Sequence, residues 1–177
     1  MCIRDRNMKE LVKNLKDPIT EEKNTYLKYS KWMKVVLRRA QVVGERELPI
    51  SALIIDQKGR CIGRGSNKRE INKDPLGHAE LIALRQAAWI KNDWRFNDCV
   101  MIVNLEPCQM CAGAIIQSRM GKVIFSASDF KRGGFGGSID LSKHKSAHHK
   151  MEVISGLMEK ESSMLIKKWF KKLRNEK

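Results

Sequence analysis

Residues 99–128, CVMIVNLEPCQMCAGAIIQSRMGKVIFSAS, decide the fold. The opening CVMIVNL is almost wholly apolar, which is typical of a strand buried on both faces. Pro107 suits the first turn of a helix, and the helical stretch after it ends near Gly121. A second apolar strand, KVIFSAS, follows at once. This order predicts two neighbouring strands joined by a helix that covers the sheet.

The segment before this unit predicts a helix, a hairpin and a second helix. Residues 31–45, KWMKVVLRRAQVVGE, carry apolar side chains at helical spacing, which predicts an amphipathic helix. The strand ISALIID and a strand over residues 61–65 flank a turn at residues 56–59, which predicts a hairpin. Residues 78–89 place their apolar side chains on one helical stripe and predict another helix.

The segment after the unit predicts a short fifth strand and a final helix. The strand is MEVISGL, residues 151–157. In the helix that follows, apolar side chains are expected to face inward and lysines outward. The inward set is Leu165, Ile166, Trp169, Phe170 and Leu173. Helices alternating with apolar strands after a hairpin predict an α/β fold, a three-layer α/β/α sandwich around a mixed five-stranded sheet.

The length of 177 residues suits one domain with a substantial core. Residues 1–29 are polar and mixed in charge, so we expect a poorly ordered N-terminal extension, and residues 30–177 form the domain. No apolar run approaches the roughly 20 residues of a membrane span. The first residues lack the apolar stretch of a signal peptide. We therefore expect a soluble, cytoplasmic protein with no membrane partner.

The chain is strongly basic, with a formal net charge of +15. Residues 141–177 contain ten lysines and arginines against four glutamates. Such an excess favours polyanionic partners, meaning nucleic acid or an anionic membrane surface. General solubility is the alternative that composition leaves open.

Five cysteines, an odd number without a secretion signal, argue against a disulfide framework. Cys108 and Cys111 stand three positions apart at the start of a predicted helix, so both thiolates emerge from one face. His78 opens the preceding helix, thirty residues before Cys108, and would supply a third ligand. Both helices follow strands, so their N-termini converge on one edge of the sheet. These residues predict a zinc site.

Three protein ligands leave the fourth tetrahedral position of zinc open to water, which is typical of a catalytic site. Zinc lowers the pKa of such a water to about 7, so a nucleophile is available at neutral pH. Glu80 can move the protons that the reaction requires. On a regular helix Glu80 would point about 200° away from His78, so the pairing requires His78 to lie at the helix start.

Two other interpretations of these residues remain open. The two thiols could be small buried apolar groups. Alternatively, the zinc could be structural, and Glu80 would then have no role. Its fourth ligand would come from Cys61, Cys99, His144, His148 or His149.

The motifs HAE and PCQMC resemble those of the zinc-dependent cytidine deaminase superfamily. Within it, the stretches ERELPISALI, GRGSNKRE, LEPCQMCAGAIIQSRMGKVIFSASD and HHKMEVISGL resemble the bacterial-type tRNA-specific adenosine deaminases. The resemblance runs from about Tyr29 to Arg174. It implies a cytidine deaminase-like fold, one zinc ion per chain, and a homodimer.

Carried over by motif, the resemblance gives His78, Cys108 and Cys111 as the zinc ligands and Glu80 as the proton shuttle. The implied reaction is hydrolytic deamination of adenosine to inosine at the wobble position of a tRNA anticodon. A loop base is already poorly stacked, so it is readily extruded into the site. The runner-up is a free nucleobase or nucleoside deaminase of the guanine or cytosine type. A non-catalytic RNA-binding module with a structural zinc is the alternative from another class.

The resemblance also implies how RNA is held. Asn67 falls where the family binds the target nucleoside, and the backbone N–H of Ala79 lies beside the base. Asp129 falls where the family meets a neighbouring ribose 2′-hydroxyl, a group that distinguishes RNA from DNA. Lys131 and Arg132 are expected to contact phosphates. The alternatives are a turn residue for Asn67, a loop cap for Asp129 and solvated side chains for the two cations.

The sequence departs from the family at three places. Ser51 stands where glycine is common, and Leu76 and Gly77 precede the ligand histidine. We expect these positions to border the substrate pocket. His148 stands where asparagine is frequent, in the loop expected to face tRNA.

Overall fold

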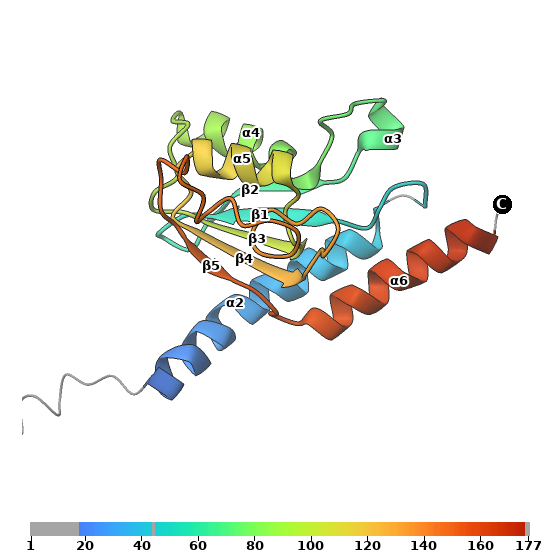
Figure 1. Ribbon diagram of the computed structural model, residues 1–177, viewed down its shortest axis with the longest axis horizontal. Helices are drawn as coiled ribbons and strands as arrows, with labels where there is room; N and C mark the ends of the chain where they lie inside the picture. Colours follow the sequence, from blue (N-terminus) through green and yellow to red (C-terminus); the bar gives the residue numbers. More distant parts are fainter. Residues whose placement is uncertain (1–17, 44, 176–177) are drawn as a thin grey trace, which may run out of the picture.

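The structure is a computed structural model that describes residues 18–43 and 45–175 (Figure 1). Its centre is one five-stranded sheet in the order β2-β1-β3-β4-β5. The strands are β1 Ser51–Ile55, β2 Cys61–Ser66, β3 Val100–Leu105, β4 Lys122–Ala127 and β5 Glu152–Ile154. The pairs β1–β2 and β1–β3 are antiparallel, and β3–β4 and β4–β5 are parallel. The mixed sheet and the initial hairpin are as predicted.

Helices cover both faces of this sheet (Figure 1). They are α2 Pro18–Gln41, α3 Arg69–Asn72, α4 Ala79–Lys91, α5 Gln109–Gln117 and α6 Glu159–Asn175. The helices α4 and α5 lie on one face, and α2 and α6 lie on the other. The three-layer α/β/α prediction is therefore confirmed. Among the described residues, no helix is both long enough and apolar enough to cross a membrane.

Successive side chains along a strand point to opposite faces of the sheet and so pack into two different apolar cores. In β1, Ala52 and Ile54 pack on the side of α4 and α5, whereas Leu53 and Ile55 pack on the side of α2. The strand β3 contributes buried residues to both cores, as predicted for a strand covered on both faces. Because α5 connects the parallel strands β3 and β4, its N-terminus lies at their carboxyl ends.

The helix α2 begins at Pro18, earlier than the predicted start at Lys31. The poor order of the N-terminal extension stays a prediction. The N-terminal part of α2 extends beyond the sheet (Figure 1). Tyr26 and Leu27 are exposed, whereas Tyr29 is buried. The exposure of Tyr26 and Leu27 agrees with the missing period, because side chains that face solvent need no apolar stripe. Residues 1–17 lie outside the described residues, and the domain boundary at residue 30 stays a prediction.

The helix α6 buries less than its pattern predicted. Leu165, Ile166 and Trp169 are half-buried, but Phe170 and Leu173 are exposed, so their predicted inward placement was wrong. The N-terminal end of α6 approaches the sheet, and its C-terminal end runs past it (Figure 1). Within the helix, Ser162 is the fully buried residue. The helical period predicted which residues form the apolar stripe of α6. It did not predict how much of that stripe is buried.

Ser162 joins a buried polar cluster centred on Asn104, at the end of β3. The Asn104 Oδ1 accepts the Ser51 N–H at 2.9 Å, and its Nδ2 donates to Pro49 O at 3.0 Å. Nδ2 also lies 3.3 Å from Ser162 Oγ, whose hydroxyl donates to Asn104 O. All these contacts are buried, and they connect α6, β1 and β3 directly.

Replacing Asn104 with alanine should therefore destabilise the fold strongly. The Asn104→Ala protein leaves the Ser51 N–H and the Pro49 carbonyl buried without partners, and each such group costs about 1–3 kcal/mol. We expect the free energy of unfolding to fall by about 3 kcal/mol in chemical denaturation. Asn97→Ala, at an exposed site, is the control and should change it little. Equal stability of both variants would contradict a structural role for the cluster.

Candidate active site

His78 lies immediately before α4, as the N-cap residue, with extended backbone angles of φ −81° and ψ 145°. The turn before it is held by Gly77 N–H donating to Asp74 O at 2.9 Å, and by His78 N–H donating to Leu76 O at 2.8 Å. His78 is therefore not part of the regular helix. This placement meets the condition under which His78 and Glu80 can face the same site.

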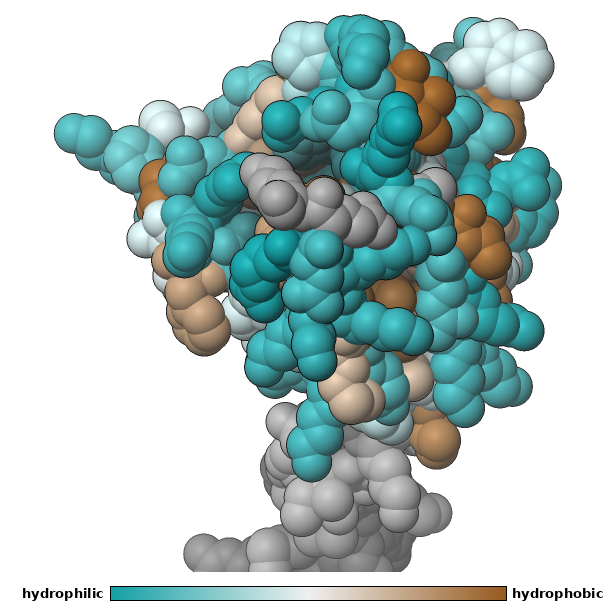
Figure 2. Space-filling model, turned by 90° about the vertical axis from the view of Figure 1, so that its right-hand side faces the viewer, coloured by the Kyte–Doolittle hydropathy of each residue, from teal (hydrophilic) through white to brown (hydrophobic). Residues whose placement is uncertain are grey.

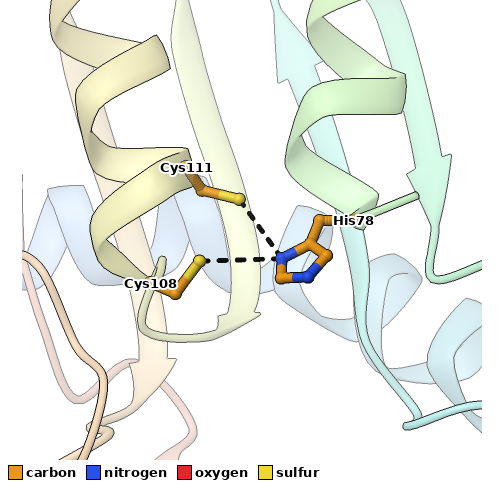
Figure 3. Close-up of side chains that lie close together, drawn as sticks. All are labelled: His78, Cys108 and Cys111. Atoms are coloured by element: carbon orange, nitrogen blue, oxygen red, sulfur yellow. Dashed lines mark hydrogen bonds between the residues drawn. The ribbon is translucent and has the colours of Figure 1, made fainter. Parts of the chain in front are cut away.

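Cys108 is the N-cap of α5, and Cys111 follows in the first turn of that helix. Figure 3 shows both thiols pointing across a gap towards the ring of His78, which comes from the other helix start. The His78 Nδ1 lies 3.6 Å from Cys108 Sγ and 3.5 Å from Cys111 Sγ. All three ligand atoms lie within 4.8 Å of one another.

These distances fit a zinc ion. Zinc binds imidazole nitrogen at about 2.0–2.1 Å and thiolate sulfur at about 2.3 Å, so tetrahedral angles place nitrogen and sulfur about 3.5 Å apart. The two measured separations of 3.5 and 3.6 Å match that spacing. One imidazole and two thiolates are also a donor set that zinc prefers. The three side chains thus supply three of the four ligands that a tetrahedral zinc ion takes.

The alternative of a four-ligand structural zinc has no support in the described residues. The only group of histidine, cysteine and carboxylate ligands there contains His78, Cys108 and Cys111. Cys99 is buried in the apolar core. His149 Nε2 pairs with Met120 O at 2.8 Å, and His144 Nδ1 pairs with Ser146 Oγ at 2.7 Å.

The two thiols differ in acidity before a metal binds. The pKa of Cys108 is lowered to about 4, because the Cys111 thiol and the His78 ring both hydrogen-bond to its thiolate. The same hydrogen bond raises the pKa of Cys111, and burial raises it further. The bond to Cys108 also raises the pKa of His78. The hydrogen bonds among the three side chains thus favour the thiolate form of Cys108.

Glu80 is in the first turn of α4, and only 5% of its surface is exposed. Burial raises the pKa of its carboxyl to about 7, and the charge of Cys108 raises it further, while His78 and a hydrogen bond with Cys111 oppose the shift. A carboxyl with this pKa can both accept and release a proton near neutral pH. The charges of Cys108 and His78 and a hydrogen bond with Cys111 all act on this carboxyl, so it lies near the predicted metal position. Sequence and structure thus bring these four side chains together.

Asn67 follows β2 and lies beside the segment that carries His78, because Lys68 N–H donates to Gly77 O at 2.9 Å. The Asn67 Nδ2 donates to Glu47 Oε2 at 2.9 Å, and Glu47 Oε1 accepts the Ile71 N–H at 2.8 Å. Glu47 thus fixes the amide so that Oδ1 is left for another donor. Ala79 is the first residue of α4, where a backbone N–H has no partner within the helix.

Asp129 lies in the loop after β4, which the structure places against the segment of Cys108. Its Oδ1 accepts the backbone N–H groups of Lys131 and Arg132 at 2.9 and 3.1 Å, so Asp129 does cap the loop. Among the described residues, Oδ2 has no hydrogen-bond partner. The cap and a contact with substrate are therefore compatible. The side chains of Lys131 and Arg132 are exposed.

Ser51 begins β1, and its place beside the substrate pocket stays a prediction. Its surface is fully buried, and its hydroxyl donates to Gly65 O at 2.9 Å. Gly77 is also buried, whereas Leu76 is 44% exposed and remains close to His78. The serine side chain therefore links β1 to β2.

Two buried carboxylates were not predicted from the sequence, although both stand within stretches that resemble the family. Glu47 is fully buried, and Glu106 is 2% exposed. A glutamate beside an apolar strand or before a metal motif is a signal that it has a buried partner. The partner could not be named, because it comes from a distant part of the chain.

Comparisons with known proteins agree with this geometry. The profile of the family described as "Cytidine and deoxycytidylate deaminase zinc-binding region" matches residues 27–127. A tRNA-specific adenosine deaminase of Haemophilus influenzae is 38% identical over 139 residues, which are 78% of this chain and 79% of that protein. The enzyme of the same name from Bacillus subtilis is 35% identical over 82% of this chain and 91% of its own.

A solved structure extends the likeness to three dimensions. It comes from a study of A-to-I editing by tRNA:A34 deaminases at the wobble position of transfer RNA. Its TM-score is 0.72 at 34% identity, and the match covers 75% of this chain and 96% of the other.

Proposed function

Because the chain belongs to the cytidine and deoxycytidylate deaminase zinc-binding family, among the tRNA-specific adenosine deaminases, we propose that it converts adenosine to inosine at the wobble position of a tRNA anticodon. The reaction consumes one water and releases one ammonia. The observation that carries the proposal is the pair of 3.5 and 3.6 Å separations between His78 and the two cysteines, beside the buried Glu80.

His78, Cys108 and Cys111 would hold the zinc ion. When bound, zinc supplies a Lewis acid that makes water nucleophilic at neutral pH. Glu80 takes a proton from this water and delivers it to N1 of the adenine ring. It then takes the proton of the new hydroxyl group on C6 and delivers it to the amine, so that the C6–N bond breaks and ammonia leaves. A carboxyl with a pKa of about 7 can accept and release both protons near neutral pH. Burial of Glu80 keeps bulk water from competing as the proton carrier.

The remaining predicted site residues would hold the RNA. Asn67 offers its Oδ1 to the target nucleoside because Glu47 occupies its Nδ2. The Ala79 N–H, free at the helix start, lies beside the base. Asp129 accepts a neighbouring 2′-hydroxyl through Oδ2, and Lys131 and Arg132 contact phosphates.

The basic surface supports a polyanionic substrate rather than a free base. Figure 2 shows hydrophilic side chains over most of the side that carries α3 and the C-terminal end of α6. The exposed cations of α6 include Lys167, Lys168, Lys171 and Arg174. Phosphate contacts by such residues make affinity fall steeply with salt. A free nucleobase deaminase, the runner-up, has no need of this surface.

We further expect a cytoplasmic homodimer, as the family resemblance implies. Sedimentation of the purified protein measures the oligomeric state directly. A monomer at the concentrations used for activity would contradict it.

The function is tested with a synthetic anticodon stem-loop that carries adenosine at the wobble position. The purified protein should form inosine in this RNA, detected by nucleoside analysis after digestion. Matched substrates are a stem-loop with guanosine at that position, free adenosine, free guanine and free cytosine. Deamination of a free base with no product from the stem-loop would support the runner-up and overturn the proposal.

Asp129→Asn should lower the preference for RNA over an equivalent DNA hairpin by about fivefold, the worth of one hydrogen bond. Asparagine keeps an oxygen for the loop cap but replaces Oδ2 with a donor, so the loop stays and the acceptor is lost. The ratio of kcat/KM on the two hairpins measures the effect. Asp93→Asn, which lies far from the loop in sequence and at the C-terminal end of α4, is the control. An unchanged ratio would count against a 2′-hydroxyl contact.

A further inference from the structure

Glu106 is a buried carboxyl group that bonds only to backbone among the described residues. Its Oε2 accepts the Asp129 N–H at 2.9 Å. Its Oε1 accepts the Phe135 and Gly137 N–H groups, each at 2.9 Å. These donors span the loop that begins at Asp129, and the carboxyl is only 2% exposed. One side chain thus accepts hydrogen bonds from three backbone N–H groups of this loop.

Two glycines of this loop lie against the Glu106 carboxyl. A Cβ added at Gly133 would lie 2.3 Å from the Glu106 carboxyl carbon. A Cβ added at Gly137 would lie 2.4 Å from Oε2. Two glycines therefore let the backbone approach the carboxyl from two sides, closer than any other residue would allow.

The same loop contacts the metal-binding segment directly. Cys108 and Gly133 form an isolated antiparallel bridge, and Gly134 N–H donates to Pro107 O at 2.9 Å. Glu106 precedes Cys108 by two residues, and its own N–H donates to Ala127 O at 2.8 Å. The segment that supplies a metal ligand and the loop that carries Asp129 are therefore joined through Glu106.

We propose that Glu106 is a positioning residue for the RNA substrate, which sets the loop of residues 129–137 at a fixed distance from the metal centre. The proposal rests on the proposed function, since it takes this loop to contact RNA. Glu106 touches neither the substrate nor the metal. It acts through Asp129, Lys131 and Arg132, whose spacing from the reacting base depends on the loop. The chemistry at Glu80 does not depend on it.

The test is Glu106→Gln. Whichever way the new amide turns, its NH₂ faces at least one backbone N–H, so the loop loses contacts. We expect faster amide hydrogen exchange in residues 129–137, with one zinc per chain retained. On the stem-loop RNA we expect KM to rise about tenfold and kcat to change less than about threefold, because lost charged hydrogen bonds weaken substrate placement. Glu152→Gln, at an exposed ion pair with Lys122, is the matched control.

Gly137→Ala tests the contact from the other side. It keeps Glu106 but places a methyl group against Oε2 and against Asp129 O. We expect the same rise in KM with little change in kcat, even if Glu106→Gln fails to fold. Gly113→Ala is its control, since a Cβ there meets nothing within 4 Å.

Three outcomes would overturn the proposal. Unchanged hydrogen exchange in the loop would show that Glu106 does not order it. A looser loop with unchanged KM would make Glu106 purely structural. A lower kcat with loss of zinc would show that it supports the metal instead. If the wild-type protein forms no inosine, the proposed function fails separately, and the exchange measurements still decide whether Glu106 orders the loop.

Discussion

Glu80→Gln should retain one zinc per chain but lose inosine formation, with kcat lower by about 10³-fold, as expected when a general acid–base is removed. Glutamine has nearly the same shape, so the packing around the site should survive. Its amide cannot accept a proton from water or deliver one to the base. Glu80, with a pKa of about 7, is suited to transfer protons near neutral pH, and the variant loses these transfers. Single-turnover rates on the stem-loop and metal analysis measure the two properties.

The comparison for this variant is Glu159→Gln, an exposed carboxyl in the first turn of α6, which should keep full activity. RNA affinity should also stay the same in Glu80→Gln, because the residue makes no predicted contact with phosphate or ribose. Near wild-type turnover would show that another group carries the proton. Loss of zinc would place Glu80 among the ligands and remove the open position.

Cys108→Ala should lose both zinc and activity, and its inosine formation should fall by at least about 10³-fold, since the nucleophile depends on the metal. The substitution removes the thiolate of lowest pKa from a three-ligand site, and two ligands hold zinc poorly. Metal analysis after dialysis and stem-loop assays measure both effects. A strong chelator should have the same effect on the wild-type protein, and added zinc should restore it.

Cys61→Ser is the matched control, because this half-buried thiol lies outside the ligand group. It should keep its zinc and its turnover. Full activity in zinc-free Cys108→Ala would rule out metal-dependent deamination by this site. Activity lost from both variants alike would point to a general effect of altered thiols.

The three side chains of the candidate zinc site could be predicted from sequence because their placement is local. His78 and Cys108 are both N-cap residues of helices that follow elements of the sheet, and Cys111 lies one turn further. Strand and helix periods locate these junctions, and the topology of parallel strands brings them to one edge. The sequence also required His78 to lie outside the regular helix, and the structure has it there.

The two buried carboxylates could not be assigned in the same way. Glu47 bonds Asn67, 20 positions away, and Glu106 bonds Phe135, 29 positions away. No period or motif links such pairs. Ser51 shows the same limit, since its burial depends on Gly65 and Asn104 and not on its neighbours in the chain.

The sequence by itself determined the α/β class and the order of the strands and of the longer helices, and it predicted the metal ligands and Glu80. Only the tertiary structure decided where α2 begins, which part of α6 is covered, and that Glu106 holds the loop of Asp129. The reason is physical. Periodicity and capping depend on residues a few positions apart, whereas the burial of a side chain depends on which distant segments pack against it.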